Sequence, residues 1–163
     1  RCIRIGSAGK TFSMTAWKVG YITAPSHLLT AIAKAHQFVT FTTPTNLQRA
    51  VSIGLEQDDS YFLELKNRQE EKRNLFNSGL TDAGFKTLET SGTYFLSVDI
   101  RSVGFKDSDV AFCEYLIHET GVAAIPLSAF YQRNGPPHFV RFCFCKQDKV
   151  LSEATTRLKL HFA

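Results

Sequence analysis

One lysine, embedded in a run of small and hydroxyl residues, constrains this chain more than any other feature. Lys10 follows three small residues that begin with Ser7, and an aromatic and β-branched stretch over 17–23 comes soon after it. Such a stretch is typical of a strand, as is the run over 1–5. The pattern therefore predicts two short strands joined by a turn that presents Lys10 at the edge of a sheet.

Several kinds of site could use this turn. Backbone amides and the Ser7 hydroxyl can hold an oxyanion while the Lys10 amine reaches beyond it, as a phosphate-bearing carbonyl cofactor requires. Residues 6–11 also look like the end of a nucleotide-binding P-loop, but Arg4 stands at its first glycine and no helix is predicted after the lysine. The Ser-x-x-Lys of penicillin-binding enzymes also matches, without its companion motifs. Because so short a motif often occurs by chance, Lys10 as a solvated turn lysine stays open too.

The bulk composition indicates a globular chain. Its 163 residues are 44% apolar and 21% charged, enough for a real core. The net charge of +4 is scattered, which disfavours nucleic acid and membrane surfaces as partners. Without a signal peptide or an apolar run of about 18 residues, we expect a soluble, cytoplasmic chain.

The cysteines are predicted to be structural. The chain has four, and Cys143 and Cys145 lie two apart on a strand-like run, a poor spacing for a shared metal ion. We therefore expect no metal site, and small buried thiols in a reducing compartment.

Apolar periodicity predicts three helices before residue 80. The first starts at 25–26, and an aromatic and hydroxyl loop over 38–44 follows it. Thr43 before Pro44 suggests a cap for the second helix. The third and longest helix is expected over 58–79.

Strands and helices alternate after Gly84. Residues 94–100 alternate so that Leu96, Val98 and Ile100 share a buried face. A helix capped at residues 107–108 and closed by Gly121 follows. A strand over 139–145 and a final amphipathic helix complete this part.

Arg141 is the only charged residue of the strand over 139–145. Alternation places it on one face with Phe139 and Cys143, where a guanidinium is costly unless an anion meets it. The anion is either a carboxylate of this chain, in a buried ion pair, or the carboxylate of a ligand held by the planar fork.

Longer motifs carry a family resemblance. Ser-Ala-Gly-Lys-Thr-Phe-Ser followed by Trp-Lys-Val-Gly-Tyr, within 7–21, resembles the cofactor-lysine segment of fold-type I, pyridoxal-phosphate-dependent class I/II aminotransferases. The likeness is strongest to the kynurenine and glutamine transaminase branch. Ala-Ile-Pro-Leu-Ser-Ala-Phe-Tyr over 124–131 and His-Phe-Val-Arg-Phe-Cys-Phe over 138–144 resemble the closing motifs of the same family. The resemblance thus covers nearly the whole chain.

The resemblance implies a role for each candidate residue. Lys10 is then the Schiff-base lysine of pyridoxal 5'-phosphate, Ser7 and Lys18 hold the cofactor phosphate, and Arg141 grips the α-carboxylate of the amino-acid substrate. Phe41 matches an aromatic residue that reaches the active site of the neighbouring subunit, which implies a homodimer.

The resemblance also implies a fold class, α/β, and a domain organisation. Residues 1–57 are the C-terminal part of a cofactor-binding large domain, 58–79 a linking helix and 80–163 a small α+β domain. Because the chain opens without methionine in what reads as mid-strand, we expect roughly the C-terminal half of a longer enzyme. By itself this half is expected to be inactive, since the groups that contact the pyridine ring precede it.

The implied activity is transamination between an aromatic, sulfur-containing or glutamine-type amino acid and a 2-oxo acid. A cysteine-conjugate β-lyase on the same scaffold also begins by removing the α-proton, and it is an alternative. A non-catalytic fragment of the enzyme is another.

Overall fold

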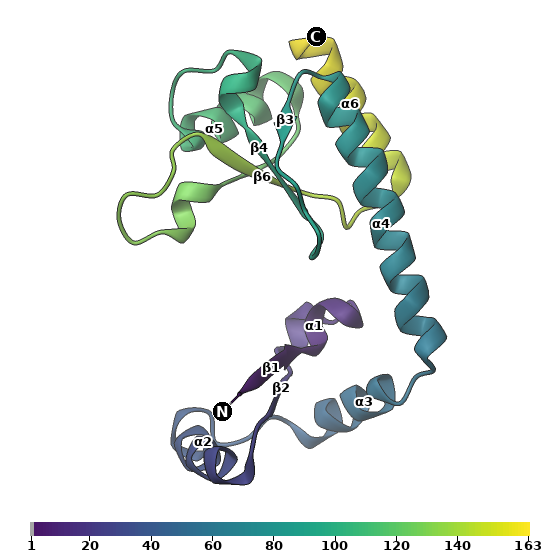
Figure 1. Ribbon diagram of the computed structural model, residues 1–163, viewed down its shortest axis with the longest axis vertical. Coiled ribbons are helices and arrows are strands. Elements are labelled where there is room, and N and C mark those ends of the chain that lie inside the picture. The colour runs from purple at the N-terminus through teal and green to yellow at the C-terminus, as the bar shows by residue number, and fades with distance from the viewer. Residues whose placement is uncertain (1) are drawn as a thin grey trace. The chain divides into compact units, whose positions relative to one another are not determined.

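The computed structural model describes residues 2–163, a mixed α/β chain that divides into two compact units (Figure 1). The first unit ends at Leu65, and the second is Lys66–Ala163. The long helix α4 (Asp59–Asp82) carries the chain from one unit to the next. The assignment of residues 1–57, 58–79 and 80–163 to a cofactor domain, a linker and a small domain stays a prediction.

The first unit contains a two-stranded antiparallel sheet followed by helices. In that sheet Arg4 pairs with Thr23 and Ser7 pairs with Gly20. Two short helical turns lie between the strands. In chain order the elements are β1 (Arg4–Ser7), α1 (Ala8–Thr11), η1 (Thr15–Trp17), β2 (Gly20–Thr23), α2 (Ser26–Val39) and α3 (Thr45–Leu55).

Two local predictions in this unit are wrong. Trp17 lies in a 3-10 turn rather than a strand, and Lys18 is left-handed with φ 55°, so β2 begins only at Gly20. The chain has to reverse its direction here so that β2 can pair antiparallel with β1. The aromatic and β-branched residues over 17–23 did not indicate this reversal. Thr43 does not cap α3; the N-cap is Pro44, which makes no side-chain capping bond.

The first unit buries little apolar surface. Its core consists of Ala8, Val19 and Val51, with Phe12, Met14 and Leu47 packed against them. Four large apolar side chains, by contrast, are at least 76% exposed: Ile5, Phe38, Val39 and Phe41.

The second unit is built on a four-stranded sheet in the order β3-β4-β6-β5, with every neighbouring pair antiparallel. The strands are β3 (Lys86–Thr87), β4 (Phe95–Asp99), β5 (Ile125–Pro126) and β6 (Phe139–Cys143). Helices α5 (Asp109–Thr120) and α6 (Asp148–Phe162) and the short 3-10 turns η2 (Ile100–Val103) and η3 (Leu127–Phe130) connect or follow them.

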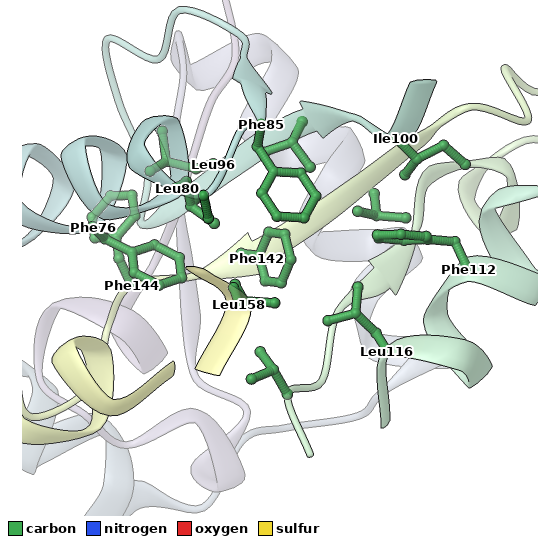
Figure 2. Close-up of a cluster of buried hydrophobic side chains, with 14 of the residues drawn as sticks. Phe76, Leu80, Phe85, Leu96, Ile100, Phe112, Leu116, Phe142, Phe144 and Leu158 are labelled. Carbon is green, nitrogen blue, oxygen red and sulfur yellow. The ribbon is translucent and has the colours of Figure 1, made fainter. Parts of the chain in front are cut away.

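One face of this sheet carries the core. As alternation predicts, Leu96, Val98 and Ile100 are at most 2% exposed. They meet apolar side chains of β6, α4, α5 and α6, and Figure 2 shows the aromatic rings of Phe85, Phe112 and Phe142 among them. The buried face therefore orients the sheet and leaves its opposite face to Arg141.

The ends of α5 are as predicted. The Ser108 hydroxyl accepts a hydrogen bond from the Ala111 amide at 3.2 Å, and Gly121 closes the helix with φ 69°. Left-handed backbone of this kind favours glycine because a side chain would be strained there.

The cysteines differ from the prediction of four buried thiols. All four are unpaired, and Cys113 is buried, but Cys2 and Cys145 are exposed and Cys143 is half-buried. Among residues 2–163, no three His, Cys, Asp or Glu side chains are grouped as metal ligands. Within the same residues, none of the helices has the length and apolar character needed to cross a membrane.

Candidate active site

The lysine turn is held together by its own backbone. The Ser7 hydroxyl accepts a hydrogen bond from the Gly9 amide at 3.3 Å and so caps α1. The Met14 amide donates to the Gly9 carbonyl at 2.9 Å, and the Ala8 amide donates to the carbonyl of Val19 in the segment that leads into β2, at 3.1 Å. Lys10 therefore lies in a single helical turn, where the sequence predicted a turn without helix.

Thr15 holds the exposed side chain of Lys10. The Lys10 Nζ donates to the Thr15 Oγ1 at 3.2 Å, and that hydroxyl donates in turn to the Gly9 carbonyl at 3.1 Å. A Cβ on Gly9 would lie 3.1 Å from the Cα of Thr15, so the close return of the chain favours glycine. Sequence reasoning missed Thr15, because only this return brings it to the lysine.

Aromatic packing anchors the turn to the helices that follow it. The ring of Phe12 stacks on Tyr61 with centroids 6.0 Å apart, and the Tyr61 hydroxyl donates to the Thr11 carbonyl at 3.0 Å. The two residues that follow Lys10 in sequence, Thr11 and Phe12, are thus fixed by the beginning of α4. The backbone that carries the amine is positioned by long-range contacts as well as by its own hydrogen bonds.

The groups of this segment fit a cofactor that bears a phosphate and a carbonyl. Because the Ser7 oxygen accepts from Gly9, its own hydrogen can be donated to an anion. The Lys18 side chain is exposed and makes no hydrogen bond or ion pair within residues 2–163, so its ammonium can face a phosphate. The same segment supplies an amine, that of Lys10, for a carbonyl.

Phe41, the other aromatic candidate of the first unit, projects from a loop. Helix α2 continues to Val39 and so includes the first two residues of the predicted loop. Phe41 is 76% exposed and has a left-handed backbone with φ 67°, which is uncommon for a bulky residue. Its ring is available to another surface.

Arg141 lies in the second unit, on the sheet face opposite the core. It occupies the inner strand β6, paired with Ser97 of β4 on one side and with Ile125 of β5 on the other. Its neighbours in sequence, Val140 and Phe142, are at most 2% exposed on the core face. Alternation therefore predicted correctly which way Arg141 points.

Two aromatic rings flank the guanidinium. The Cζ atom of Arg141 is 3.8 Å from the ring centroid of Phe95 and 4.5 Å from that of Phe130. Such cation–π contacts replace part of the hydration of a guanidinium without neutralising it. Sequence reasoning missed both rings, although Phe130 belongs to a motif that the resemblance singled out.

The Arg141 guanidinium has no anionic partner within residues 2–163. No carboxylate forms an ion pair with it, and its Nε is buried without a hydrogen-bond partner. The alternative of an ion pair with a carboxylate of this chain is therefore wrong for the described residues. A buried donor left unpaired is costly, so this group is suited to an external carboxylate.

The sequence candidates thus fall into two groups. Ser7, Lys10 and Lys18 share one segment of the first unit, and Phe41 lies in a loop of the same unit. Arg141 belongs to the second unit, with Phe95 and Phe130 around it.

Comparisons with known proteins connect both groups to one family. The model of the family "Aminotransferase class I and II" matches residues 2–158. The chain is 42% identical to a kynurenine–oxoglutarate transaminase of Dictyostelium discoideum, covering 97% of this chain and 41% of that protein. Among solved structures, a methionine aminotransferase of Escherichia coli has a TM-score of 0.90 and 39% identity, covering 98% of this chain and 42% of that one. An N-succinyldiaminopimelate aminotransferase of Mycobacterium tuberculosis has a TM-score of 0.89 and 38% identity, covering 97% of this chain and 41% of that one. The chain spans about two fifths of the length of these relatives.

Proposed function

Because the chain belongs to the class I and II aminotransferase family, we propose that the protein containing it transfers an amino group from an amino acid to a 2-oxo acid. We propose pyridoxal 5'-phosphate as its cofactor. The proposed amino acids are of the aromatic, sulfur-containing or glutamine type. Relatives named for kynurenine and for methionine support the first two classes.

The environment of Arg141 is the observation that carries the proposal. A guanidinium between two aromatic rings, with a buried and unpartnered Nε, can donate hydrogen bonds to both oxygens of a substrate carboxylate. Bidentate binding fixes the plane of the carboxylate, and so orients the α-carbon next to it. Arg141 is therefore the proposed carboxylate-binding residue.

Lys10 is the proposed proton carrier at the substrate α-carbon. The bound cofactor supplies an electron sink for the negative charge that develops there. A neutral Lys10 amine can take the α-proton as a general base and deliver it later as a general acid. The hydrogen bond from its Nζ to Thr15 restricts where the amine lies, and the packing of Phe12 restricts the backbone beneath it.

The remaining candidates have binding roles in this proposal. Ser7 and Lys18 hold the cofactor phosphate, one by a hydroxyl hydrogen bond and the other by charge. Phe41 extends to a neighbouring subunit, so the protein is a homodimer. Residues 1–57 then belong to the cofactor domain, 58–79 link it to the next domain, and 80–163 form the small α+β domain. Since the relatives are more than twice as long, residues 1–163 alone are expected to be inactive.

Chemical trapping tests the role of Lys10. Borohydride reduction of the protein with pyridoxal phosphate, followed by peptide mapping, is expected to place the cofactor on Lys10 because its amine is exposed beside a phosphate-binding segment. The Lys10→Arg variant is the matched control and should carry no label, since guanidinium does not react in this way. A label on another lysine would refute the assignment.

A charge-conserving substitution tests the role of Arg141. Arg141→Lys should raise KM for amino acids by about 10- to 100-fold, because an ammonium cannot replace the bidentate fork. Amines without a carboxylate should react as before. Arg68→Lys, at an exposed position of α4, is the control and should change neither. Equal losses for amino acids and amines would show that Arg141 is structural.

A further inference from the structure

Asp109 is a buried charge that the proposed reaction does not use. It is 1% exposed, and it is the only buried charged side chain among residues 2–163. It stands at the first position of α5, directly after the N-cap Ser108. The partial positive charge of a helix N-terminus favours a carboxylate there, but burial still has a desolvation cost that hydrogen bonds must offset.

Both oxygens of this carboxylate bind one residue of the turn η3. Oδ2 accepts a hydrogen bond from the Ser128 amide at 2.7 Å, and Oδ1 accepts one from the Ser128 hydroxyl at 2.8 Å. These are charge-assisted bonds, the stronger kind in proteins. The Asp109 side chain thus fixes the position and the orientation of η3 (Leu127–Phe130).

The backbone of Asp109 holds the other end of the same loop. Its amide donates to the Pro137 carbonyl at 2.7 Å, two residues before β6. Between these ends the loop folds back on itself, since a Cβ on Gly135 would lie 2.9 Å from the Cα of Ser128. One residue of α5 therefore closes the loop over 128–137 at both ends.

This loop carries one of the rings that flank Arg141. Phe130 is two residues from Ser128, and its ring centroid is 4.5 Å from the Arg141 Cζ. Phe130 is otherwise 59% exposed, so little except η3 keeps its ring in place. A shift of η3 would move the ring and allow the guanidinium to leave the orientation in which it meets a carboxylate.

We propose that Asp109 is a positioning residue for carboxylate binding: by holding Ser128, it keeps Phe130 against Arg141 and so fixes the guanidinium. The proposal rests on the proposed function, in which Arg141 binds the substrate carboxylate. Asp109 itself touches neither Arg141 nor the substrate. Its effect reaches the site through Ser128 and Phe130.

Two probes in the protein that contains this chain, loaded with cofactor, separate positioning from general stability. The first is the dissociation constant of 3-phenylpropanoate, which has the carboxylate but no amine. The second is the rate with 2-phenylethylamine, which has the amine but no carboxylate. Asp109→Asn should raise the dissociation constant of 3-phenylpropanoate by about five- to tenfold, comparable to the loss of about one ordinary hydrogen bond, and leave the rate with 2-phenylethylamine within about twofold.

Matched variants identify the route of the effect. Ser128→Ala removes one of the two hydrogen bonds and should give a smaller selective loss, whereas Ser128→Thr keeps the hydroxyl and should restore binding. Asp82→Asn, at an exposed position of α4, should change neither probe. If Asp109→Asn does not fold, the Ser128 pair provides the same test.

A double-mutant cycle completes the experiment. In a Phe130→Ala background, Asp109→Asn should cause almost no further loss of 3-phenylpropanoate binding, because its effect passes through Phe130. Additive losses, or equal losses for both probes, would overturn the positioning role. If Arg141→Lys leaves 3-phenylpropanoate binding unchanged, the proposed function itself fails. If Arg141→Lys weakens binding and Asp109→Asn does not, only the role of Asp109 fails.

Discussion

The two units differ in how much of their apolar surface they bury themselves. In the second unit, sixteen buried residues from the sheet, from α4, α5 and α6 and from the segments that connect them form one core. In the first, three buried residues form the core, while Phe38 and Val39 at the end of α2 are 87% and 85% exposed. α2 buries none of its residues, although its apolar side chains recur at helical spacing.

This difference separates two ways of building a site. The surroundings of Arg141 follow from a sheet whose opposite face is anchored by a large core. The surroundings of Lys10 follow from a few local hydrogen bonds and the contacts of Phe12. A chain that exposes so much apolar surface is stabilised by covering it, so the first unit is expected to depend more on contacts outside itself.

The largest expected effect is the difference between truncating a buried aromatic ring in the second unit and an exposed one in the first. Phe112→Ala removes a fully buried side chain and should lower the free energy of unfolding by about 3–5 kcal/mol. Phe38→Ala, at an exposed position, should change it by less than about 0.5 kcal/mol. Urea unfolding of residues 1–163, followed by circular dichroism, measures both. A comparable loss for Phe38→Ala would mean that the exposed face of α2 is packed in solution.

Thiol reactivity should distinguish the buried interior of the second unit from exposed positions of the chain. Burial raises the pKa of the Cys113 thiol to about 11, and nearby Asp109 and Glu114 add to the shift. At pH 8 the thiolate, the reactive form, is then roughly 100-fold scarcer than for an ordinary cysteine. Iodoacetamide labelling followed by mass spectrometry should modify Cys2 and Cys145 first. Equal labelling of Cys113 would show that the second unit opens readily.

The smallest expected effect concerns a surface ion pair of the second unit. The Arg101 guanidinium, hydrogen-bonded to Asp99, holds the pKa of that carboxyl below its usual value. A lowered folded-state pKa stabilises the fold above the unfolded-state pKa, about 3.9, and this contribution is lost as the pH falls through the folded-state value. Arg101→Ala should raise the pKa of Asp99, measured by an NMR titration of its carboxyl carbon.

Stability at pH 7 should barely change in that variant, because the Arg101 guanidinium is exposed and ion pairs at a protein surface contribute little. A large loss would indicate that surface charge, rather than the core, distinguishes the second unit from the first. An unchanged pKa would show that the ion pair does not form in solution.

Elements with an apolar face could be predicted well. Leu96, Val98 and Ile100 turn to the core as their alternation indicated, and Ser108 and Gly121 bound α5 as their capping chemistry indicated. Less was predictable where an element has no buried face. In the lysine segment, the left-handed turn at Lys18 replaced part of an expected strand, because a chain reversal leaves no periodic signal.

The same division holds for the candidate site. Lys10 could be singled out in the sequence by the small and hydroxyl residues before it and by the motif around it, and Arg141 because it is the only charge of an apolar strand. Thr15, Phe95 and Asp109 could not, since each acts on a residue that is distant in the chain or reached only after a turn.

The sequence by itself determined which residue types recur at helical and strand spacing, where α5 begins and ends, and which face of β6 Arg141 occupies. These follow from periodicity and from local hydrogen bonding, both of which act over a few residues. Only the tertiary structure decided that Arg141 lies between Phe95 and Phe130 without a carboxylate of its own, and that Asp109 holds the loop beside it. Such contacts depend on strand register and on chain reversals, which local energies do not specify.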